Sequence, residues 1–135
     1  MYYGSMNANE VKHMKTVILV GSMLISNLAL AATPEVTKAE VAHLLGAVEQ
    51  SQCRFNRNGS WYDAKSARKH LASKFEYLDK KDMLPSAESF IKLGASSSSS
   101  SGKAYMMACS GQQPVPSAVW LIEELNKYRN TAVLK

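Results

Sequence analysis

Two cysteines, Cys53 and Cys109, constrain what this chain can fold into more than any other feature, because they are its only ones. A widely spaced pair predicts a disulfide if the protein folds in an oxidising compartment. Such a bridge would close a loop of roughly 55 residues and stabilise the fold by about 4 kcal/mol in the chain-entropy model. The alternative is two reduced, buried thiols. A redox-active pair is disfavoured, since catalytic thiols usually form a C-x-x-C motif at a helix N-terminus.

The N-terminal segment has the three parts of a secretory signal. Basic residues precede an uncharged, apolar run at residues 16–30, and Ala29-Leu30-Ala31 supplies the small side chains of a cleavage site. A retained membrane anchor is the alternative, but the run is shorter than the ~20 apolar residues of a span. We therefore expect a leader over residues 1–31, with Met14 as a more natural start, and a periplasmic or secreted domain over residues 32–135 without a stable membrane anchor.

Composition is that of an ordinary globular domain. Of the 135 residues, 46% are hydrophobic and 20% are charged, and this length predicts one domain. The net charge of +5 is scattered along the chain rather than clustered. Because nucleic-acid binding needs a clustered basic patch, we expect no nucleic-acid partner.

Periodicity and turn signals predict an α+β domain with about four helices packed on a small antiparallel hairpin and one further strand. Thr37-x-x-Glu40 is a capping box for a helix over residues 36–51. Asn58-Gly59, between two short aromatic segments, predicts a tight hairpin, because a type I′ turn needs two positive φ angles. Asp63 would cap the next helix, over residues 64–80.

The second half is predicted to add two helices around the further strand. Pro85-Ser86 begins a short helix that Gly94 stops. The six serines at 96–101 favour a loop that packs against nothing. Residues 104–108 can form a strand that ends at Cys109, and a bond to Cys53 requires this strand to lie beside or just behind the hairpin. Residues 111–116 form a turn, and the last helix begins at Ser117.

Two sets of motifs run through the mature region. The first half carries Cys53-x-Phe55-x-Arg57-Asn58-Gly59-x-x-Tyr62-x-Ala64-x-x-Ala67-x-x-His70-Leu71-x-x-Lys74. The second half carries Ala87-x-x-Phe90-Ile91, Ala95-Ser96-x-Ser98-x-x-Ser101-Gly102-x-x-Tyr105, Cys109 and Trp120-Leu121. In this combination the mature region resembles the YfeK-like family of small secreted bacterial proteins of unknown function. The resemblance implies an envelope protein with paired cysteines, and it implies no activity.

Two histidines are candidates for chemistry. His70 lies beside the apolar stripe of the second helix, with Lys74 one turn further on, and His43 lies at the edge of the first helix. His70 is either a base or ligand, or a boundary residue that hydrogen-bonds the hairpin or a helix end, which we favour. Two histidines without a third ligand make a poor zinc site, so we expect no metal and no cofactor.

The hairpin and the serine loop are candidates for binding. Trp61 and Tyr62 point to opposite faces of a regular strand, so one should be in the core and the other exposed with Arg57, a composition typical of interaction hot spots. The motif Ser101-Gly102-x-x-Tyr105 is similar to a loop of periplasmic lysozyme inhibitors, although those proteins are β-rich.

Three functions follow from these residues. The first is a non-catalytic binding protein whose partner is an envelope protein or cell-wall component. The second is an inhibitor of a cell-wall hydrolase that uses residues 101–105 as a plug. The third is a small hydrolase centred on His70, although neither a Ser/His/Asp set nor a nucleotide-binding glycine motif is recognisable in the sequence.

Overall fold

A computed structural model describes residues 31–135 of the chain. The apolar run of the expected leader lies outside these residues, so the leader stays a prediction. The elements in chain order are α1 (Glu35–Gln50), β1 (Arg54–Arg57), β2 (Ser60–Tyr62), α2 (Ala64–Asp79), α3 (Ala87–Gly94), β3 (Met106–Ala108), β4 (Val115–Pro116) and α4 (Ser117–Val133). The predicted α+β class is confirmed.

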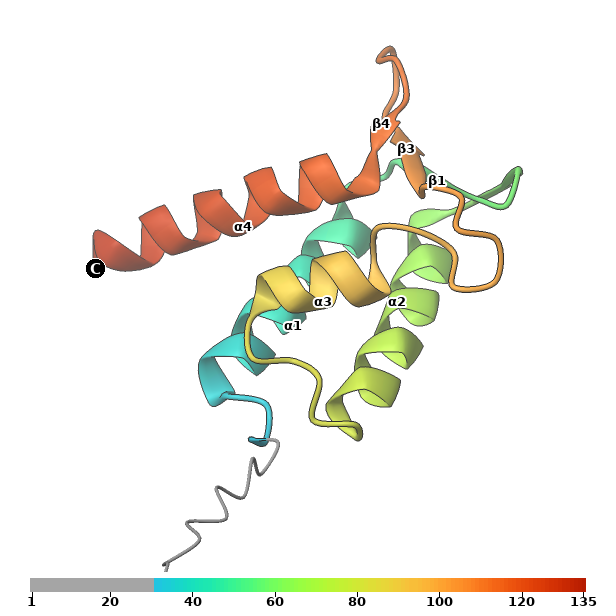
Figure 1. Cartoon of the computed structure of the whole chain (residues 1–135). Helices are drawn as coiled ribbons and strands as arrows, with labels where there is room; N and C mark the ends of the chain where they lie inside the picture. Colours follow the sequence, from blue (N-terminus) through green and yellow to red (C-terminus); the bar gives the residue numbers. More distant parts are fainter. Residues whose placement is uncertain (1–30) are drawn as a thin grey trace, which may run out of the picture.

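The four helices pack on one another, and a small sheet lies at the end of α4 where that helix begins (Figure 1). Apolar side chains at helical spacing explain this packing, since a helix must bury its apolar stripe. The fully or nearly fully buried core residues come from all four helices and from the sheet: Val41, Leu44, Val48, Leu71, Phe90, Ile91, Met107, Leu121 and Leu125. No helix within residues 31–135 is long and apolar enough to cross a membrane.

The hairpin is built around the predicted turn. Asn58 and Gly59 both have positive φ, 52° and 84°, which is the backbone that Asn-Gly tolerates at low cost. β1 pairs antiparallel with β2 on one side and with β3 on the other, so the strand order is β2-β1-β3-β4. The further strand therefore lies beside the hairpin, as predicted.

The edge strand β4 was not expected from the sequence. Residues 111–116 do contain a turn, in which the Gln112 N–H donates to the Cys109 carbonyl at 3.0 Å. The chain then becomes extended again, and Val115 pairs with Met107. Two residues are too few to leave a periodic signal, so the predicted turn covers only the first part of this segment.

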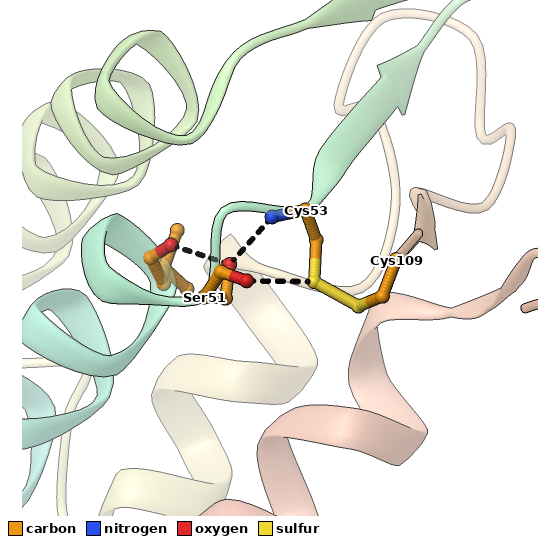
Figure 2. Close-up of a disulfide and its surroundings, with 4 residues drawn as sticks. Ser51, Cys53 and Cys109 are labelled. Carbon is orange, nitrogen blue, oxygen red and sulfur yellow. Dashed lines mark hydrogen bonds between the residues drawn. A yellow bond between two sulfur atoms is a disulfide. The ribbon is translucent and has the colours of Figure 1, made fainter. Parts of the chain in front are cut away.

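The disulfide joins Cys53 and Cys109, as predicted (Figure 2). In the β1–β3 ladder Arg54 faces Ala108, so the two cysteines occupy the next pair of the same antiparallel register. Ser51 ends α1 just before this point: its Oγ donates to the Val48 carbonyl at 2.7 Å and accepts from the Cys53 N–H at 3.2 Å. The bridge thus fastens the end of α1 and the start of β1 to the end of β3.

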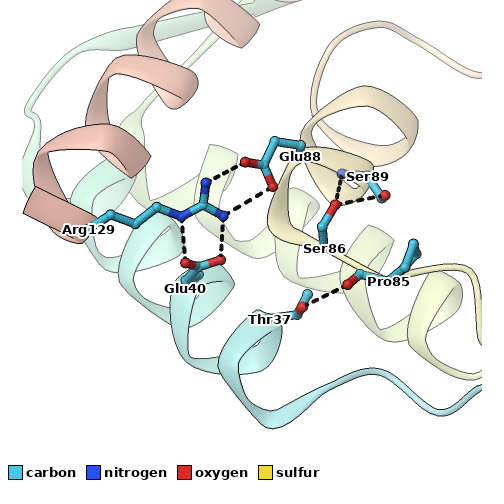
Figure 3. A network of polar contacts seen from close by, with 7 residues as sticks. All are labelled: Thr37, Glu40, Pro85, Ser86, Glu88, Ser89 and Arg129. Carbon is cyan, nitrogen blue, oxygen red and sulfur yellow. Dashed lines mark hydrogen bonds and ion pairs between the residues drawn. The ribbon is translucent and has the colours of Figure 1, made fainter. Parts of the chain in front are cut away.

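The helices are joined at the other end by Arg129 of α4 (Figure 3). Its guanidinium donates to both oxygens of Glu40 on α1, at 2.7 and 2.9 Å, and also to Glu88 on α3. The predicted capping box is wrong, because α1 begins at Glu35 and Glu40 pairs with Arg129. Thr37 is buried within the helix and donates to the Pro85 carbonyl at 3.4 Å. Tertiary partners have overridden the local motif.

The predicted Asp63 cap is confirmed, Ser86 caps the next helix in the same way, and one glycine has another role than expected. Asp63 accepts from the Ser66 N–H at 2.7 Å at the start of α2, and Ser86 accepts from the Ser89 N–H at 3.2 Å at the start of α3. Gly94 does not stop α3 with a left-handed turn. A Cβ there would lie 3.1 Å from side-chain atoms of Leu78 and Phe90, which is a tight contact, so the glycine favours close packing of α3 on α2.

Candidate functional site

A cavity of about 220 Å³ opens between β1, the first half of α2 and the start of α4. Its apolar wall comes from elements that are distant in the sequence. This wall is formed by Phe55 of β1, Ala67 and Leu71 of α2, Ala95 directly after α3, and Leu121 of α4. Concave, mostly apolar sites with a few fixed polar groups are where small molecules usually bind, so the cavity is the candidate site.

The polar groups of the cavity form a chain that runs across it. Arg57 Nη1 lies 3.2 Å from His70 Nδ1, and His70 Nε2 lies 3.2 Å from the Tyr105 hydroxyl. These three residues come from β1, α2 and the segment before β3. Arg57 also lies over the ring of Tyr62, with its Cζ 5.4 Å from the ring centroid. The hairpin register places Tyr62 opposite Phe55, which puts both on the cavity side of the sheet.

This geometry assigns the protons of the chain. A guanidinium can only donate, so Nδ1 of His70 is the acceptor in the bond with Arg57. Burial, followed by the charges of Arg57 and Lys74, lowers the pKa of His70 below its ordinary value of 6.5. The imidazole is therefore neutral at pH 7 and carries its proton on Nε2, which donates to Tyr105. Burial raises the pKa of Tyr105, so its hydroxyl keeps a proton of its own to donate.

Ser117, the first residue of α4, adds a donor at the wall of the cavity. It is 4% exposed, and its Oγ has no hydrogen-bond partner among the residues that the structure describes. Its backbone N–H donates to the Tyr105 carbonyl at 2.9 Å, which fixes the start of α4 next to Tyr105. A buried hydroxyl without a partner is costly and uncommon, so this group calls for an explanation.

The cavity has a positive electrostatic bias. Arg57 is the only Arg or Lys that lines it, and no Asp or Glu of residues 31–135 is among the lining residues. The ion pairs found in this part of the chain involve Arg68 and Arg129 but not Arg57. The N-terminus of α4 also presents the positive end of its helix dipole at Ser117. An anion is therefore favoured over a cation at this site.

Four of the eight binding residues proposed from the sequence line the cavity, and four do not. Arg57, Tyr62, His70 and Tyr105 are brought together. Trp61 points to the other face of the hairpin, as expected from strand alternation, but neither aromatic of the pair is in the core: Trp61 is 39% and Tyr62 36% exposed. The expectation that one of them is buried is wrong, because the sheet has only one core-facing side there and the cavity occupies it.

The other three lie on or beside the serine loop, which is ordered against the hairpin turn. Ser98 is 5% exposed and accepts from Asn58 Nδ2 at 3.1 Å, and Ser101 donates to Asn58 Oδ1 at 2.5 Å. Lys74 donates to Ser99. The prediction that the serine run packs against nothing is therefore wrong. Gly102 has φ 71° and lies in the exposed turn of this loop.

The lining residues that sequence reasoning did not propose for the site come from both halves of the chain, and Ser117 is the one whose buried hydroxyl has no partner in the described residues. The sequence identified Ser117 only as the start of the last helix. Ser117 lies 60 positions from Arg57 in the numbering, and no local pattern connects them. The one available signal was the disulfide, which implies that the segment after Tyr105 returns to the hairpin.

The site has little of what metal or acid–base chemistry needs. Within residues 31–135, no group of three His, Cys, Asp or Glu side chains could hold a metal ion. Both ring nitrogens of His70 have partners, and a guanidinium takes the place where a catalytic triad has a carboxylate. His43 pairs with Glu124 at 2.9 Å and stacks on Tyr128, at the interface of α1 and α4 and outside the cavity lining.

Comparison with known proteins identifies a family for this chain but does not identify an activity. No curated protein and no solved structure matches the chain, and the resemblance to the YfeK-like family stays a prediction. The model of one family, described as "Family of unknown function (DUF5329)", matches residues 35–129, which run from the first residue of α1 to Arg129 and include the whole cavity. The chain therefore belongs to the DUF5329 family of unknown function.

Proposed function

We propose that this protein is a non-catalytic binding protein that holds a small molecule in the cavity between β1, α2 and α4. The observation that carries the proposal is Ser117, which lines the cavity and whose buried hydroxyl has no partner in the described part of the chain. Such a group is costly, and a ligand in the cavity would supply the missing hydrogen bond. The cavity is smaller than the ~300–1,000 Å³ of sites for drug-sized ligands, which favours a compact ligand.

Binding is favoured over hydrolysis by the surroundings of His70. The neighbouring cations Arg57 and Lys74 lower its pKa, which makes the imidazole a weaker base. A general base works best with a pKa near the working pH and usually has a carboxylate that orients it. The Arg57–His70–Tyr105 chain instead fixes three side chains in place, as a rigid binding wall requires.

An inhibitory plug at residues 101–105 is less well supported by the surroundings of Tyr105. Its side chain is 6% exposed and hydrogen-bonded to His70, so it would be inaccessible to an enzyme cleft. Ser101 is held by Asn58. We further propose that the protein acts in the periplasm or outside the cell, which the Cys53–Cys109 disulfide supports.

The test is a panel of four small aromatic compounds that differ in charge: benzoate, phenylacetate, benzyl alcohol and benzylamine. Ligand-observed NMR and calorimetry would measure their binding to residues 32–135. Ser66 lines the cavity and is exposed on the first turn of α2, so Ser66→Trp should cover the opening. Lys69→Trp adds the same ring on the same helix at an exposed position outside the cavity lining, and it is the matched control.

Saturable binding of at least one compound is expected, with Ser66→Trp weakening it at least about tenfold and Lys69→Trp leaving it unchanged. Absence of binding by all four compounds would overturn the proposal. Binding that both tryptophan variants retain would place the ligand elsewhere and overturn it as well.

A further inference from the structure

We infer that the ligand is a small monoanionic acid, with a carboxylate held by Arg57, Tyr105 and Ser117 and a compact apolar body against Phe55, Leu71 and Leu121. This inference rests on the proposed binding function and adds the chemical class of the ligand. It follows from which hydrogen-bonding groups around the cavity remain unused, from the sign and number of its charges, and from its size.

The two hydroxyls without a full set of partners, those of Tyr105 and Ser117, can each donate a hydrogen bond. The neutral His70 accepts from Arg57 and donates to Tyr105, so both of its nitrogens are occupied. The Tyr105 hydroxyl accepts from His70, and its own proton finds no second partner in the part of the chain that the structure describes. The Ser117 hydroxyl has none either. A ligand that accepts several hydrogen bonds at one end complements this set, and a carboxylate has two oxygens with about four acceptor positions.

The charges of the residues that line the cavity favour a ligand with a single negative charge. Among residues 31–135, the Arg57 guanidinium is the only cationic side chain that lines the cavity, and with His70 neutral these residues supply no second positive side chain there. A guanidinium binds a carboxylate through two parallel hydrogen bonds. A phosphate monoester carries close to two negative charges at pH 7, and burial of the second charge beside an apolar wall without a partner is strongly unfavourable. The cavity therefore favours a carboxylate over a phosphate.

The apolar wall of the cavity determines which groups the ligand can carry besides its carboxylate. Apart from the more exposed Tyr62, the apolar part of the lining is made of aliphatic and aromatic side chains that are 8% exposed or less: Phe55, Ala67, Leu71, Ala95 and Leu121. A cavity of about 220 Å³ has room for a ring or a short branched chain and excludes a long acyl chain. A small aromatic or branched aliphatic acid combines these properties.

The test uses the charge panel on the protein of residues 32–135. Benzoate or phenylacetate should bind at least about tenfold more tightly than benzyl alcohol, because a charged hydrogen bond is worth a tenfold affinity or more. Benzylamine should bind most weakly. Phenyl phosphate, added as a dianionic probe, should bind more weakly than the carboxylates.

Two variants locate the carboxylate. Arg57→Gln should remove the preference for acid over alcohol, whereas Arg54→Gln, which removes the same charge from an exposed position of β1 outside the cavity lining, should keep it. Ser117→Ala should weaken the acid several-fold while the melting temperature of the free protein stays the same or rises, because a buried donor without a partner is removed.

The outcomes separate the two proposals. If the alcohol binds as tightly as the acids, and Ser66→Trp still prevents binding, the cavity binds ligands but the inference of an acid is wrong. Tighter binding of phenyl phosphate than of benzoate would overturn the choice of a monoanion. An Arg57→Gln variant that melts like the parent and keeps the preference for acid would place the carboxylate on other residues and overturn the inference too.

Discussion

Arg57 and Arg129 are both half-buried arginines that connect separate elements of the fold, and they differ in what they contact. Arg129 donates to two carboxylates, Glu40 and Glu88, and thereby joins α4 to α1 and α3 (Figure 3). Arg57 contacts a neutral imidazole and the face of Tyr62, and no carboxylate of the described residues pairs with it. One arginine is satisfied by the protein, and the other retains donors for a molecule from outside.

The two ends of the domain are accordingly stabilised in different ways. At the helical end, the hydrogen bonds that Arg129 donates to Glu40 and then to Glu88 raise the pKa of Arg129, and the bond to Arg129 lowers the pKa of Glu88. At the sheet end, the disulfide and the β-ladder hold the elements while the Ser117 hydroxyl has no partner among the described residues. Polar groups thus serve stability at one end, and at the other they are left free beside a cavity.

The largest expected effect tests what holds the sheet end together. A variant with Cys53→Ser and Cys109→Ser should lose about 4 kcal/mol of unfolding free energy, because the reduced chain gains the entropy of an open loop with a sequence separation of 56 residues. Urea unfolding followed by circular dichroism measures this change. The parent protein under a reducing agent is the control and should show the same loss. A loss under about 1 kcal/mol would mean that the ladder alone holds the sheet end.

The second effect compares the two arginines directly. Arg129→Ala should lower the unfolding free energy by about 2 kcal/mol, because it leaves Glu40, whose side chain is 9% exposed, buried without a partner. Arg57→Ala should cost less than about 1 kcal/mol, since it removes a single hydrogen bond and a cation–π contact. Thermal and urea unfolding of both variants checks this. Equal losses, or a larger loss at Arg57, would contradict the division between a structural and a binding arginine.

Local features of the fold could be predicted from the sequence because they depend on a few neighbouring residues. Short-range chemistry predicts the Asn58-Gly59 turn and the Asp63 cap. The disulfide follows from the presence of two cysteines, which have only one possible pairing. Errors arose where a distant partner competed with the local motif. Glu40 has the spacing of a capping box, but its carboxylate pairs with Arg129, 89 positions away.

The sequence predicted only part of the candidate site, for a similar reason. Arg57 and Tyr62 lie in one hairpin, and His70 lies in the first half of α2, the helix that follows it. The sequence therefore places these three residues near each other. Ser117 became part of the site only because β3 and β4 return the chain to the hairpin. The Ser117 hydroxyl is a candidate binding group because it is buried and has no partner among the described residues, and the sequence reveals neither property.

The smallest effect tests the protonation of the chain at the cavity. Because burial and then Arg57 and Lys74 lower the pKa of His70 in the folded protein, the unfolded chain binds more protons than the folded one below about pH 6.5. The unfolding free energy should therefore be highest above that pH and fall as the pH is lowered through about 6.5 toward the folded value. Urea unfolding between about pH 7.5 and 5 measures the slope, above the range in which Asp and Glu normally titrate.

His70→Gln should flatten this part of the profile, and His43→Gln, at the α1–α4 interface, should leave the His70 contribution in place. A profile that rises toward low pH, and that His70→Gln flattens, would mean that His70 is protonated in the folded protein, and its Nδ1 could then not accept from Arg57. A profile that His70→Gln leaves unchanged would mean that folding does not lower the pKa of His70, and it would contradict this prediction as well.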